Sequence, residues 1–233
     1  MFGTFIYDPL YNGLIALIGV IPGGDAGIAA IVFTIIVRFI LFPLSKSAIR
    51  TQEGMKKIQP ELQRLKEEHK DDPQTQAQKM FALYKEEGIN PFASIGLILI
   101  QLPIIFALYF VFLKGGLPEV DMDVLYSFVR APETVSMMFV GFVDLTKRSI
   151  VLALLAGITQ YIHARKAFSA PAERDGSFGG DFAHSMQLQM KYGMPVLITI
   201  IAWTLPAIIA LYWVTSNVFT IFQEMFIRRR LAN

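Results

Sequence analysis

Long apolar runs alternate with polar segments along this chain. One run carries a single charge, Arg38, a second carries none, and a third is shorter and extends through flanking polar residues. A helix needs about 20 apolar residues to cross the hydrocarbon core of a bilayer. The pattern therefore predicts membrane-spanning helices over about 27–45, 91–113 and 149–166.

The last apolar stretch, 192–227, is too long for one span. As a single helix it would extend about 54 Å, whereas the hydrocarbon core is about 30 Å thick. Lys191 precedes it and an arginine triplet at 228–230 follows it, which favours placing both ends in the cytoplasm. Pro206 is the natural breaking point, because proline lacks a helical donor. We therefore predict two spans, 192–206 and 207–227, and five in all.

The distribution of charge predicts the orientation of these spans. The chain has 21 basic and 19 acidic residues, so its net charge of +2 is uninformative by itself. Sixteen basic residues lie in 46–90, 164–191 and 228–230, whereas 114–148 holds four and 1–26 holds none. Basic residues concentrate on the cytoplasmic side, so the N-terminus is predicted outside and the C-terminus inside. A hydrophobic content of 54% excludes a disordered chain.

The first 24 residues have apolar positions at roughly helical spacing but no Lys or Arg, so they do not resemble a secretory signal. Their glycines and Pro22 make a full span unfavourable. We predict an amphipathic helix in the outer interface over 1–24, with a sixth, short span as the alternative. The absence of Cys excludes disulfides, thiolate metal sites and a lipid-modified cysteine.

Residues 46–90 break the membrane pattern and predict a cytoplasmic helical hairpin. Asp72 precedes Pro73 as an N-cap would, and Gly88 fits the end of the second helix. The hairpin is either a solvated connector or a functional element, and its length favours a role in docking or gating, since helix connections commonly have about 2–8 residues. The candidate docking side chains are Met55, Ile58, Leu62, Leu65, Met80 and Tyr84. The outer segment 114–148 is predicted as loop with short helical pieces, and 167–190 as a flexible cytoplasmic loop.

Arg38 is the one charge that lies well inside a predicted span rather than at its cytoplasmic end. A central arginine costs about 2.5–3.5 kcal/mol on insertion scales. One interpretation is that its side chain reaches the cytoplasmic interface. The other is a wet cavity, because the spans hold no Asp or Glu to pair with it except Glu224, near the cytoplasmic end of the last. The lack of intramembrane carboxylates argues against ion-coupled transport, and no HExxH motif or nucleophile–base set indicates a hydrolase.

Polar residues in the spans support a wet pocket around Arg38, although each could instead make an ordinary interhelical hydrogen bond. Thr34 lies four residues before Arg38 and hence on the same helix face. The others are Gln101, Gln160, Thr199, Thr204, Thr215, Ser216, Asn217 and Thr220.

Three strings in this sequence resemble the YidC-type membrane protein insertases. They are TIIVRFILFPLSKSAIRTQEGMKKIQPELQRLKEEHKDD, LYKEEGINPFASIGLILIQLPIIFALYFVF and MPVLITIIAWTLPAIIALYWVTSNVFTIFQEMFIRR. The resemblance covers about residues 25–230. It implies an all-α polytopic protein with five transmembrane helices around a hydrophilic groove open to the cytoplasm, in a bacterial plasma membrane. It also implies that Arg38 is the groove arginine, that Thr34, Gln101 and Gln160 line the groove, and that Trp203 and Tyr212 flank the substrate path. We add Asn217 to this set as a polar residue of the last span.

The resemblance implies insertion of single- and double-spanning proteins with short translocated tails. The implied partners are nascent membrane proteins, membrane lipids and, as candidates, the ribosome and the Sec translocon. No cofactor, metal, nucleotide or nucleic-acid site is expected, and the chain is not expected to be an enzyme. The resemblance also leads us to expect neither the large outer domain, nor the lipoprotein-type N-terminus, nor the long basic C-terminal tail that some members carry. An assembly factor that only holds client helices and, less favoured, a small-solute transporter remain alternatives.

Overall fold

The computed structural model describes residues 3–90, 109–112, 117–167 and 184–232. The described part is mostly helical, as expected, and the chain divides into two compact units. Unit 1 comprises Met1–Ile40 and Leu102–Gln223, and unit 2 comprises Leu41–Gln101 and Glu224–Asn233. By length and hydropathy, none of the helices in these described ranges crosses a membrane alone. Only α2 and α3, read together across the break at Leu41, meet that requirement.

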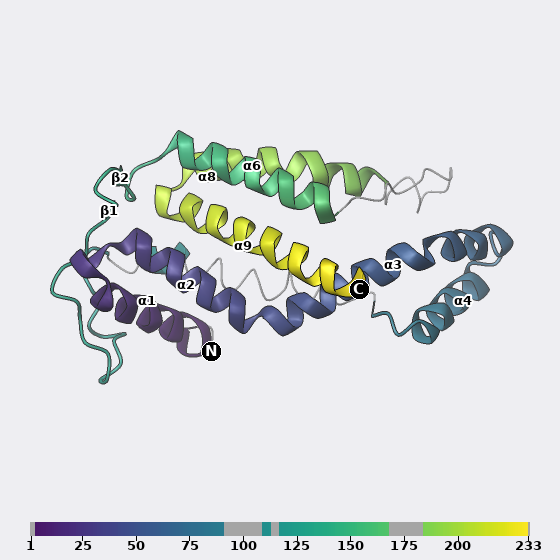
Figure 1. Ribbon diagram of the computed structural model, residues 1–233, viewed down its shortest axis with the longest axis horizontal. Coiled ribbons are helices and arrows are strands. Elements are labelled where there is room, and N and C mark those ends of the chain that lie inside the picture. Colours follow the sequence, from purple (N-terminus) through teal and green to yellow (C-terminus); the bar gives the residue numbers. More distant parts are fainter. Residues whose placement is uncertain (1–2, 91–108, 113–116, 168–183, 233) are drawn as a thin grey trace. The chain divides into compact units, whose positions relative to one another are not determined.

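Unit 1 contains most of the helices drawn in Figure 1. Its elements are a π-helical turn (Gly3–Tyr7), α1 (Asp8–Val20), a 3-10 turn (Pro22–Gly24), α2 (Ala26–Ile40), β1 (Met138–Phe139), β2 (Val143–Asp144), α6 (Ile150–Ala167), a π-helical turn (Gln189–Gly193), α8 (Met194–Thr204) and the part of α9 (Ala207–Ala232) that ends at Gln223. Unit 2 contains α3 (Phe42–Glu68), α4 (Pro73–Glu86) and the last residues of α9.

Helix α1 packs against α2 and buries its apolar side within unit 1. The side chains of Tyr11, Leu14, Ile15 and Ile18 are fully buried. The Asn12 amide group, also buried, donates to the carbonyl of Val124 and accepts from the backbone N–H of Tyr126. These contacts tie the outer segment to α1. The placement of this helix in a membrane interface stays a prediction.

The break between α8 and α9 lies at the predicted position. Leu205 is extended, and Pro206 separates the two helices. The first free amides of α9 find partners in the segment before α6, because Ala207 N–H donates to Lys147 O and Ile208 N–H donates to Leu145 O. The break is therefore stabilised by tertiary hydrogen bonds as well as by the missing donor of proline.

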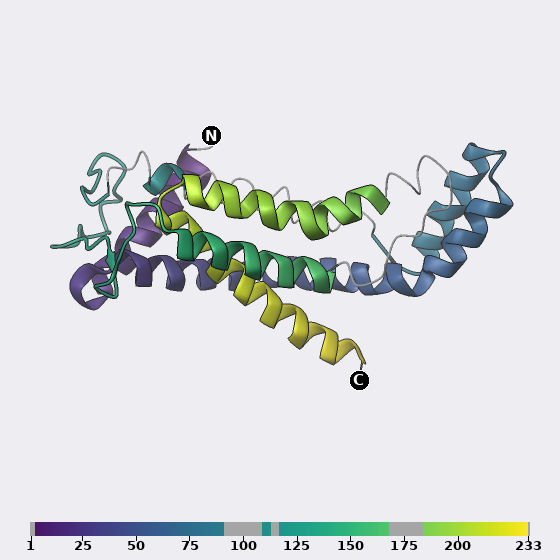
Figure 2. The ribbon, with the colours of Figure 1, turned by 90° about the horizontal axis from the view of Figure 1, so that it is seen from above.

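Helices α6 and α8 lie side by side in both ribbon views (Figures 1 and 2). Gly157 of α6 is the closest point of approach. A Cβ atom at this position would overlap the hydroxyl of Thr199 and lie 3.2 Å from the carbonyl oxygen of Pro195. Glycine at this position is therefore required by the packing of α6 against α8 and not by the local conformation of α6.

The outer segment differs from the prediction. No helix is found over 117–149, and the short helical pieces predicted there are wrong as far as this described range extends. Instead β1 and β2 form a two-stranded antiparallel pair, with Met138 opposite Asp144 and Phe139 opposite Val143. Pro118 and Pro132 interrupt helical hydrogen bonding, and the tertiary contacts of Asp25 organise the rest.

Asp25 joins this strand pair to the start of α2. Its buried carboxylate accepts hydrogen bonds from the backbone N–H groups of Gly27 and Ile28, which caps the helix. Its second oxygen accepts from Val140 N–H at 2.7 Å. One side chain thus satisfies donors of both elements.

Replacing Asp25 with alanine is expected to lower the free energy of unfolding by about 1–2 kcal/mol, because a cap is lost and the Val140 amide loses its acceptor. Asp25→Asn keeps one carbonyl oxygen and should lose less. Thermal unfolding of the purified protein in detergent measures both. An Asp25→Ala variant as stable as the original protein would contradict the role of this carboxylate.

Unit 2 is built around the α3–α4 hairpin. Helix α3 begins directly after Leu41, with Pro43 in its first turn, so α2 ends at Ile40 rather than continuing to the predicted residue 45. At the other end of the chain, Arg228 of α9 forms an ion pair with Glu53 of α3. This pair links the base of the hairpin to the C-terminal segment within unit 2.

The second helix of the hairpin starts as predicted. The exposed carboxylate of Asp72 accepts hydrogen bonds from the N–H groups of Gln74 and Thr75 and from the Thr75 hydroxyl. Pro73 occupies the first turn, and Gly88 follows the helix with a positive φ of 63°. The N-cap and the terminating glycine are both confirmed.

Replacing Asp72 with alanine is expected to accelerate hydrogen exchange at Gln74 and Thr75 several-fold, because the first turn loses its acceptor. The hydrogen bonds from Thr75 hold the pKa of Asp72 below its ordinary value. The cap is therefore complete above about pH 4 and weakens as the pH falls through the lowered pKa. Asp71→Ala is the matched control, and equal exchange in the two variants would contradict the cap.

Candidate functional site

Arg38 lies in the last turn of α2, in the middle of the apolar sequence that follows Ala26. Its Nε donates to the Ser216 hydroxyl of α9 at 3.0 Å, and one terminal nitrogen, Nη2, donates to the same oxygen. Both residues belong to unit 1. The partner of this cation is thus a neutral hydroxyl on another helix.

The remaining guanidinium donors distinguish this arginine from a structural ion pair. A guanidinium has five N–H donors, and a single hydroxyl oxygen engages only part of them. Among residues 3–90, 109–112, 117–167 and 184–232, no carboxylate forms a salt bridge with Arg38. The described surroundings hold the arginine in place without neutralising its charge.

Two further residues of α9 belong to this polar cluster, which we define as Arg38, Tyr212, Ser216 and Asn217. Tyr212 is buried and close enough to Arg38 for an electrostatic interaction. Tyr212 and Ser216 are four residues apart and therefore share a helix face. Asn217 is also buried, and its amide reaches α6, donating to Thr159 Oγ1 at 3.3 Å and to Ala156 O at 3.5 Å.

The cluster joins three helices of unit 1 through polar side chains. Arg38 and Ser216 connect α2 with α9, and Asn217 connects α9 with α6. The rings of Phe39 and Phe219 pack edge to face beside the arginine, with centroids 5.1 Å apart. The Ser216 hydroxyl thus orients Arg38 between helices whose other packing groups are mainly aliphatic and aromatic.

The other predicted groove residues have different surroundings. Thr34 is buried, and its hydroxyl donates to the Ala30 carbonyl of its own helix. Gln160 is partly buried on α6, and Trp203 is 54% exposed near the end of α8. No hydrogen bond or ring contact in the described ranges joins Gln160 or Trp203 to Arg38. Gln101 lies outside the described residues, as does most of the second predicted span.

In the sequence, Ser216 is one of several polar residues in the last two predicted spans. The signal that could have singled it out is its spacing from Tyr212, since a tyrosine and a serine four residues apart form a polar stripe on an otherwise apolar helix. The spacing does not say which neighbouring helix this stripe faces. That required the packing of α9 against α2.

The candidate docking residues of the hairpin mostly face its interior. Ile58, Leu62 and Leu83 form the buried core between α3 and α4, and Met55, Leu65, Met80, Tyr84 and Ile89 pack against it. Burial raises the pKa of Tyr84 above its ordinary value. All six docking candidates therefore already have an internal partner in the hairpin, four of them as half-buried side chains. Between Phe42 and Asn90, all of which the structure describes, Phe81 is the large apolar side chain that is exposed, at 58%.

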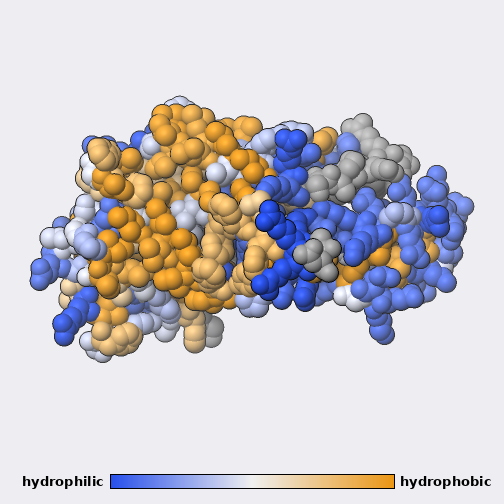
Figure 3. All heavy atoms as spheres, in the orientation of Figure 1, coloured by the Kyte–Doolittle hydropathy of each residue, from blue (hydrophilic) through white to orange (hydrophobic). Residues whose placement is uncertain are grey.

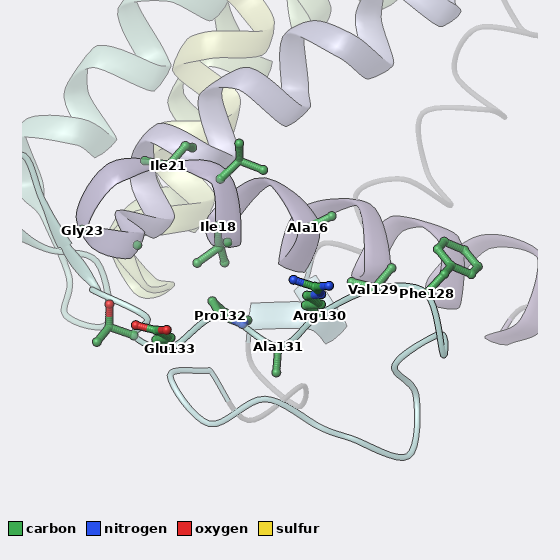
Figure 4. A pocket seen from close by; sticks show the side chains of 14 residues that line it. Ala16, Ile18, Ile21, Gly23, Phe128, Val129, Arg130, Ala131, Pro132 and Glu133 are labelled. Carbon is green, nitrogen blue, oxygen red and sulfur yellow. The ribbon is translucent and has the colours of Figure 1, made fainter.

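A cavity of about 640 Å³ lies in unit 1, between the end of α1 and the extended segment 128–134. Figure 4 shows Ala16, Ile18 and Ile21 on one side and Val129, Arg130, Pro132 and Glu133 on the other. None of the predicted groove residues lines it. This cavity is therefore separate from the Arg38 cluster.

Much of the surface of unit 1 is apolar, as the orange area over its helices in Figure 3 shows. On α6 the exposed residues include Ile150, Val151, Leu154 and Ile158, with exposures of 49–63%. Soluble proteins rarely expose apolar patches of this extent. The α3–α4 hairpin of unit 2 is mainly hydrophilic in the same view.

Known proteins are similar in sequence to this chain over almost its whole length. Residues 18–233 match the family described as 60Kd inner membrane protein. A membrane protein insertase YidC of Ectopseudomonas mendocina is 32% identical over 97% of this chain and 34% of its own length. The Francisella philomiragia protein of the same description is 31% identical over 88% of this chain and 33% of its own length.

The length of the relatives varies. This chain spans about a third of the first relatives, but it covers 87% of a membrane protein insertase YidC from Clostridium perfringens, with 32% identity over 96% of this chain. The shared region contains α2, the polar cluster and the α3–α4 hairpin. The chain belongs to the 60Kd inner membrane protein family, the YidC family of membrane protein insertases.

Proposed function

We propose that this chain inserts single- and double-spanning proteins into the bacterial plasma membrane, through a hydrophilic groove that opens to the cytoplasm and contains Arg38. The observation that carries the proposal is the set of groups that surround Arg38. It lies within an apolar helix, a hydroxyl of α9 orients it, and no carboxylate of the described residues neutralises it. Membership of an insertase family supports the same function.

The proposed topology has five spans with the N-terminus outside and the C-terminus in the cytoplasm. The basic residues support it, because the α3–α4 hairpin, the region before α8 and the end of α9 carry most of them. In this topology the hairpin is cytoplasmic and receives clients or docks a partner. The ribosome and the Sec translocon are the proposed partners besides nascent chains and lipid.

The proposed mechanism is physical and needs no nucleotide. A wet groove shortens the apolar path that a polar tail must cross. Arg38 attracts acidic residues of that tail transiently, since a charge pair at about 4 Å is worth about 4 kcal/mol at an effective dielectric of 20. Apolar client segments then leave sideways into lipid, where burial contributes about 25 cal/mol per Å² of apolar surface.

Reconstitution in liposomes that contain no other protein tests this function. A small client with an acidic tail is added, and protease protection of the tail after insertion is scored. Protection that depends on the reconstituted chain supports an insertase. A client that binds and gains no protected tail indicates an assembly factor that only holds helices.

The same vesicles test the transporter alternative. Leakage or uptake of small solutes without client protection would contradict the proposed function. The discriminating feature is that an insertase moves a polypeptide segment and leaves the solute permeability of the vesicle unchanged.

A further inference from the structure

The turn of the β1–β2 pair presents apolar side chains where turns normally carry polar ones. Val140 is 56% exposed and Phe142 is 85% exposed, and Met138 beside them is 43% exposed. Gly, Asn, Asp, Ser and Pro dominate turns, each for a conformational or hydrogen-bonding reason. We call the residues Met138, Val140 and Phe142 the apolar tip.

The backbone of this turn makes its composition more unusual. Val140 has a φ of 52°, in the left-handed region that β-branched residues rarely adopt. Asn or Gly would fit this conformation with less strain. A valine at this position is therefore unfavourable for the turn itself, and its side chain needs another partner to explain it.

Two contacts hold the apolar tip next to the start of α2 in unit 1. Val140 N–H donates to Asp25, the same carboxylate that caps the first turn of α2. Phe139 points inward and packs against Gly27, where a Cβ would overlap its ring. The apolar tip is thus hydrogen-bonded to the residue that caps the start of α2. This end of α2 is outside in the proposed topology.

The same segment also meets the corresponding ends of α6 and α9. Lys147 O accepts from the first amide of α9, and the Ser149 hydroxyl accepts from Leu152 N–H at the start of α6. The exposed apolar face of α6 begins at Ile150, eight residues after Phe142. The short segment from the apolar tip to α6 therefore leads directly into the helix whose exposed apolar face meets lipid in the proposed topology.

Basic side chains lie beside the tip in sequence. The Lys147 side chain is 79% exposed, and Arg148 is exposed as well. Asp144, the acid nearest to them in sequence, accepts hydrogen bonds from Thr146 and forms a salt bridge with Lys147, and these contacts lower its pKa to about 2. Arg148 has no such ion pair among the described residues. Apolar groups next to basic ones at the end of a span are the composition of a membrane interface.

We propose that the apolar tip inserts into the outer leaflet of the bilayer at the boundary between headgroups and acyl chains, and that the exposed Arg148 contacts lipid phosphates. The partner is the lipid surface itself. This inference rests on the topology in the proposed function. In the proposed topology the spans already hold unit 1 in the membrane. The β1–β2 pair, which Asp25 joins to the start of α2, adds a second attachment.

The absence of Cys allows a direct measurement of depth. Met138→Cys carries an environment-sensitive fluorophore on the tip while leaving Val140 and Phe142 intact, and Asp123→Cys, an exposed position of the same outer segment, is the matched control. Both are reconstituted in liposomes and quenched with spin-labelled lipid or with aqueous iodide. We expect the tip label to be quenched several-fold more by the lipid probe and several-fold less by iodide than the control label.

Two variants separate anchoring from folding. Val140→Asn suits the left-handed backbone, so it should leave thermal stability unchanged or raise it, while the Met138→Cys label loses part of its quenching by lipid. Adding Phe142→Asn should reduce that quenching further. Unchanged lipid quenching in the double variant would overturn the proposal.

The remaining outcomes are also decisive. Equal iodide quenching of the tip and control labels would overturn the proposal in favour of a solvated turn. Protection from iodide without quenching by spin-labelled lipid would overturn it in favour of a protein partner or a second copy. Insertion of a client in the same vesicles is scored separately, so a failed anchor and a failed insertase are distinguishable.

Discussion

Replacing Arg38 with alanine is expected to reduce insertion of an acidic-tailed client about tenfold or more, because the lost attraction exceeds the roughly 1.4 kcal/mol that corresponds to a factor of ten. Arg38→Lys should retain much of the activity, since a lysine keeps the charge and loses only the planar donor geometry. The measurement is the protease-protected fraction of the client in liposomes. Arg38→Ala with the activity of the original protein would disprove the electrostatic part of the mechanism.

A second client separates charge from packing. Its tail carries Asn and Gln in place of Asp and Glu, so Arg38 can offer it no comparable attraction. We expect Arg38→Ala to affect this client much less than the acidic one. Equal losses for both clients would mean that the arginine acts only by holding α2 against α9 through Ser216.

Ser216→Ala is the matched control for orientation. It removes the hydroxyl that accepts from Nε of Arg38 and leaves the positive charge in place. We expect an intermediate loss of insertion with the acidic client, because the charge remains but its position becomes less defined. Thermal unfolding of each variant shows whether a loss of activity reflects a loss of folded protein.

Replacing Gly157 with alanine is expected to lower the free energy of unfolding by about 3 kcal/mol, at the upper end for overpacking. The new methyl group would overlap the Thr199 hydroxyl and press on the Pro195 carbonyl, which belongs to the backbone and cannot rotate away. Helix α8 would have to move relative to α6. The midpoint of thermal unfolding in detergent measures the effect.

Thr199→Ala in the Gly157→Ala background should restore part of the stability, because it removes the atom that overlaps most. Gly19→Ala is the control, since its Cβ would meet only atoms at 3.9 Å or beyond and alanine favours the helix. It should be neutral or stabilising. If Gly157→Ala behaves like Gly19→Ala, the close approach of α6 and α8 is wrong.

Local signals in the sequence were strongest where one residue type has one physical consequence. Pro206 predicted the break between α8 and α9, and Asp72 with Pro73 predicted the start of α4. Spacings of 3, 4 and 3 residues separate Met55, Ile58, Leu62 and Leu65, which is the pattern of an apolar seam on a helix, and in the structure these side chains pack in the core between α3 and α4. These features depend on neighbours in the chain, so the sequence could show them.

Features that depend on residues far apart in the chain were missed or remained open. The strand pair was missed because its stability comes from Asp25, more than a hundred residues away, rather than from the propensity of its own short strands. The sequence does not identify the partner of Arg38, because helical periodicity identifies a face and not the helix that it meets. Trp203 and Tyr212 were paired as predicted site residues, yet Tyr212 is buried near Arg38 and Trp203 is exposed on α8.

The sequence by itself therefore determined the helical class, the family and the presence of one arginine within an apolar helix without an acid beside it. Periodicity, proline position and residue type carry that information, since each acts over a few residues. Only the tertiary structure decided that Ser216 orients Arg38, that Gly157 lets α6 meet α8, and that Asp25 holds the apolar tip at the end of α2. The physical reason is that hydrogen bonds and close contacts between distant segments depend on how helices pack, which no local pattern specifies.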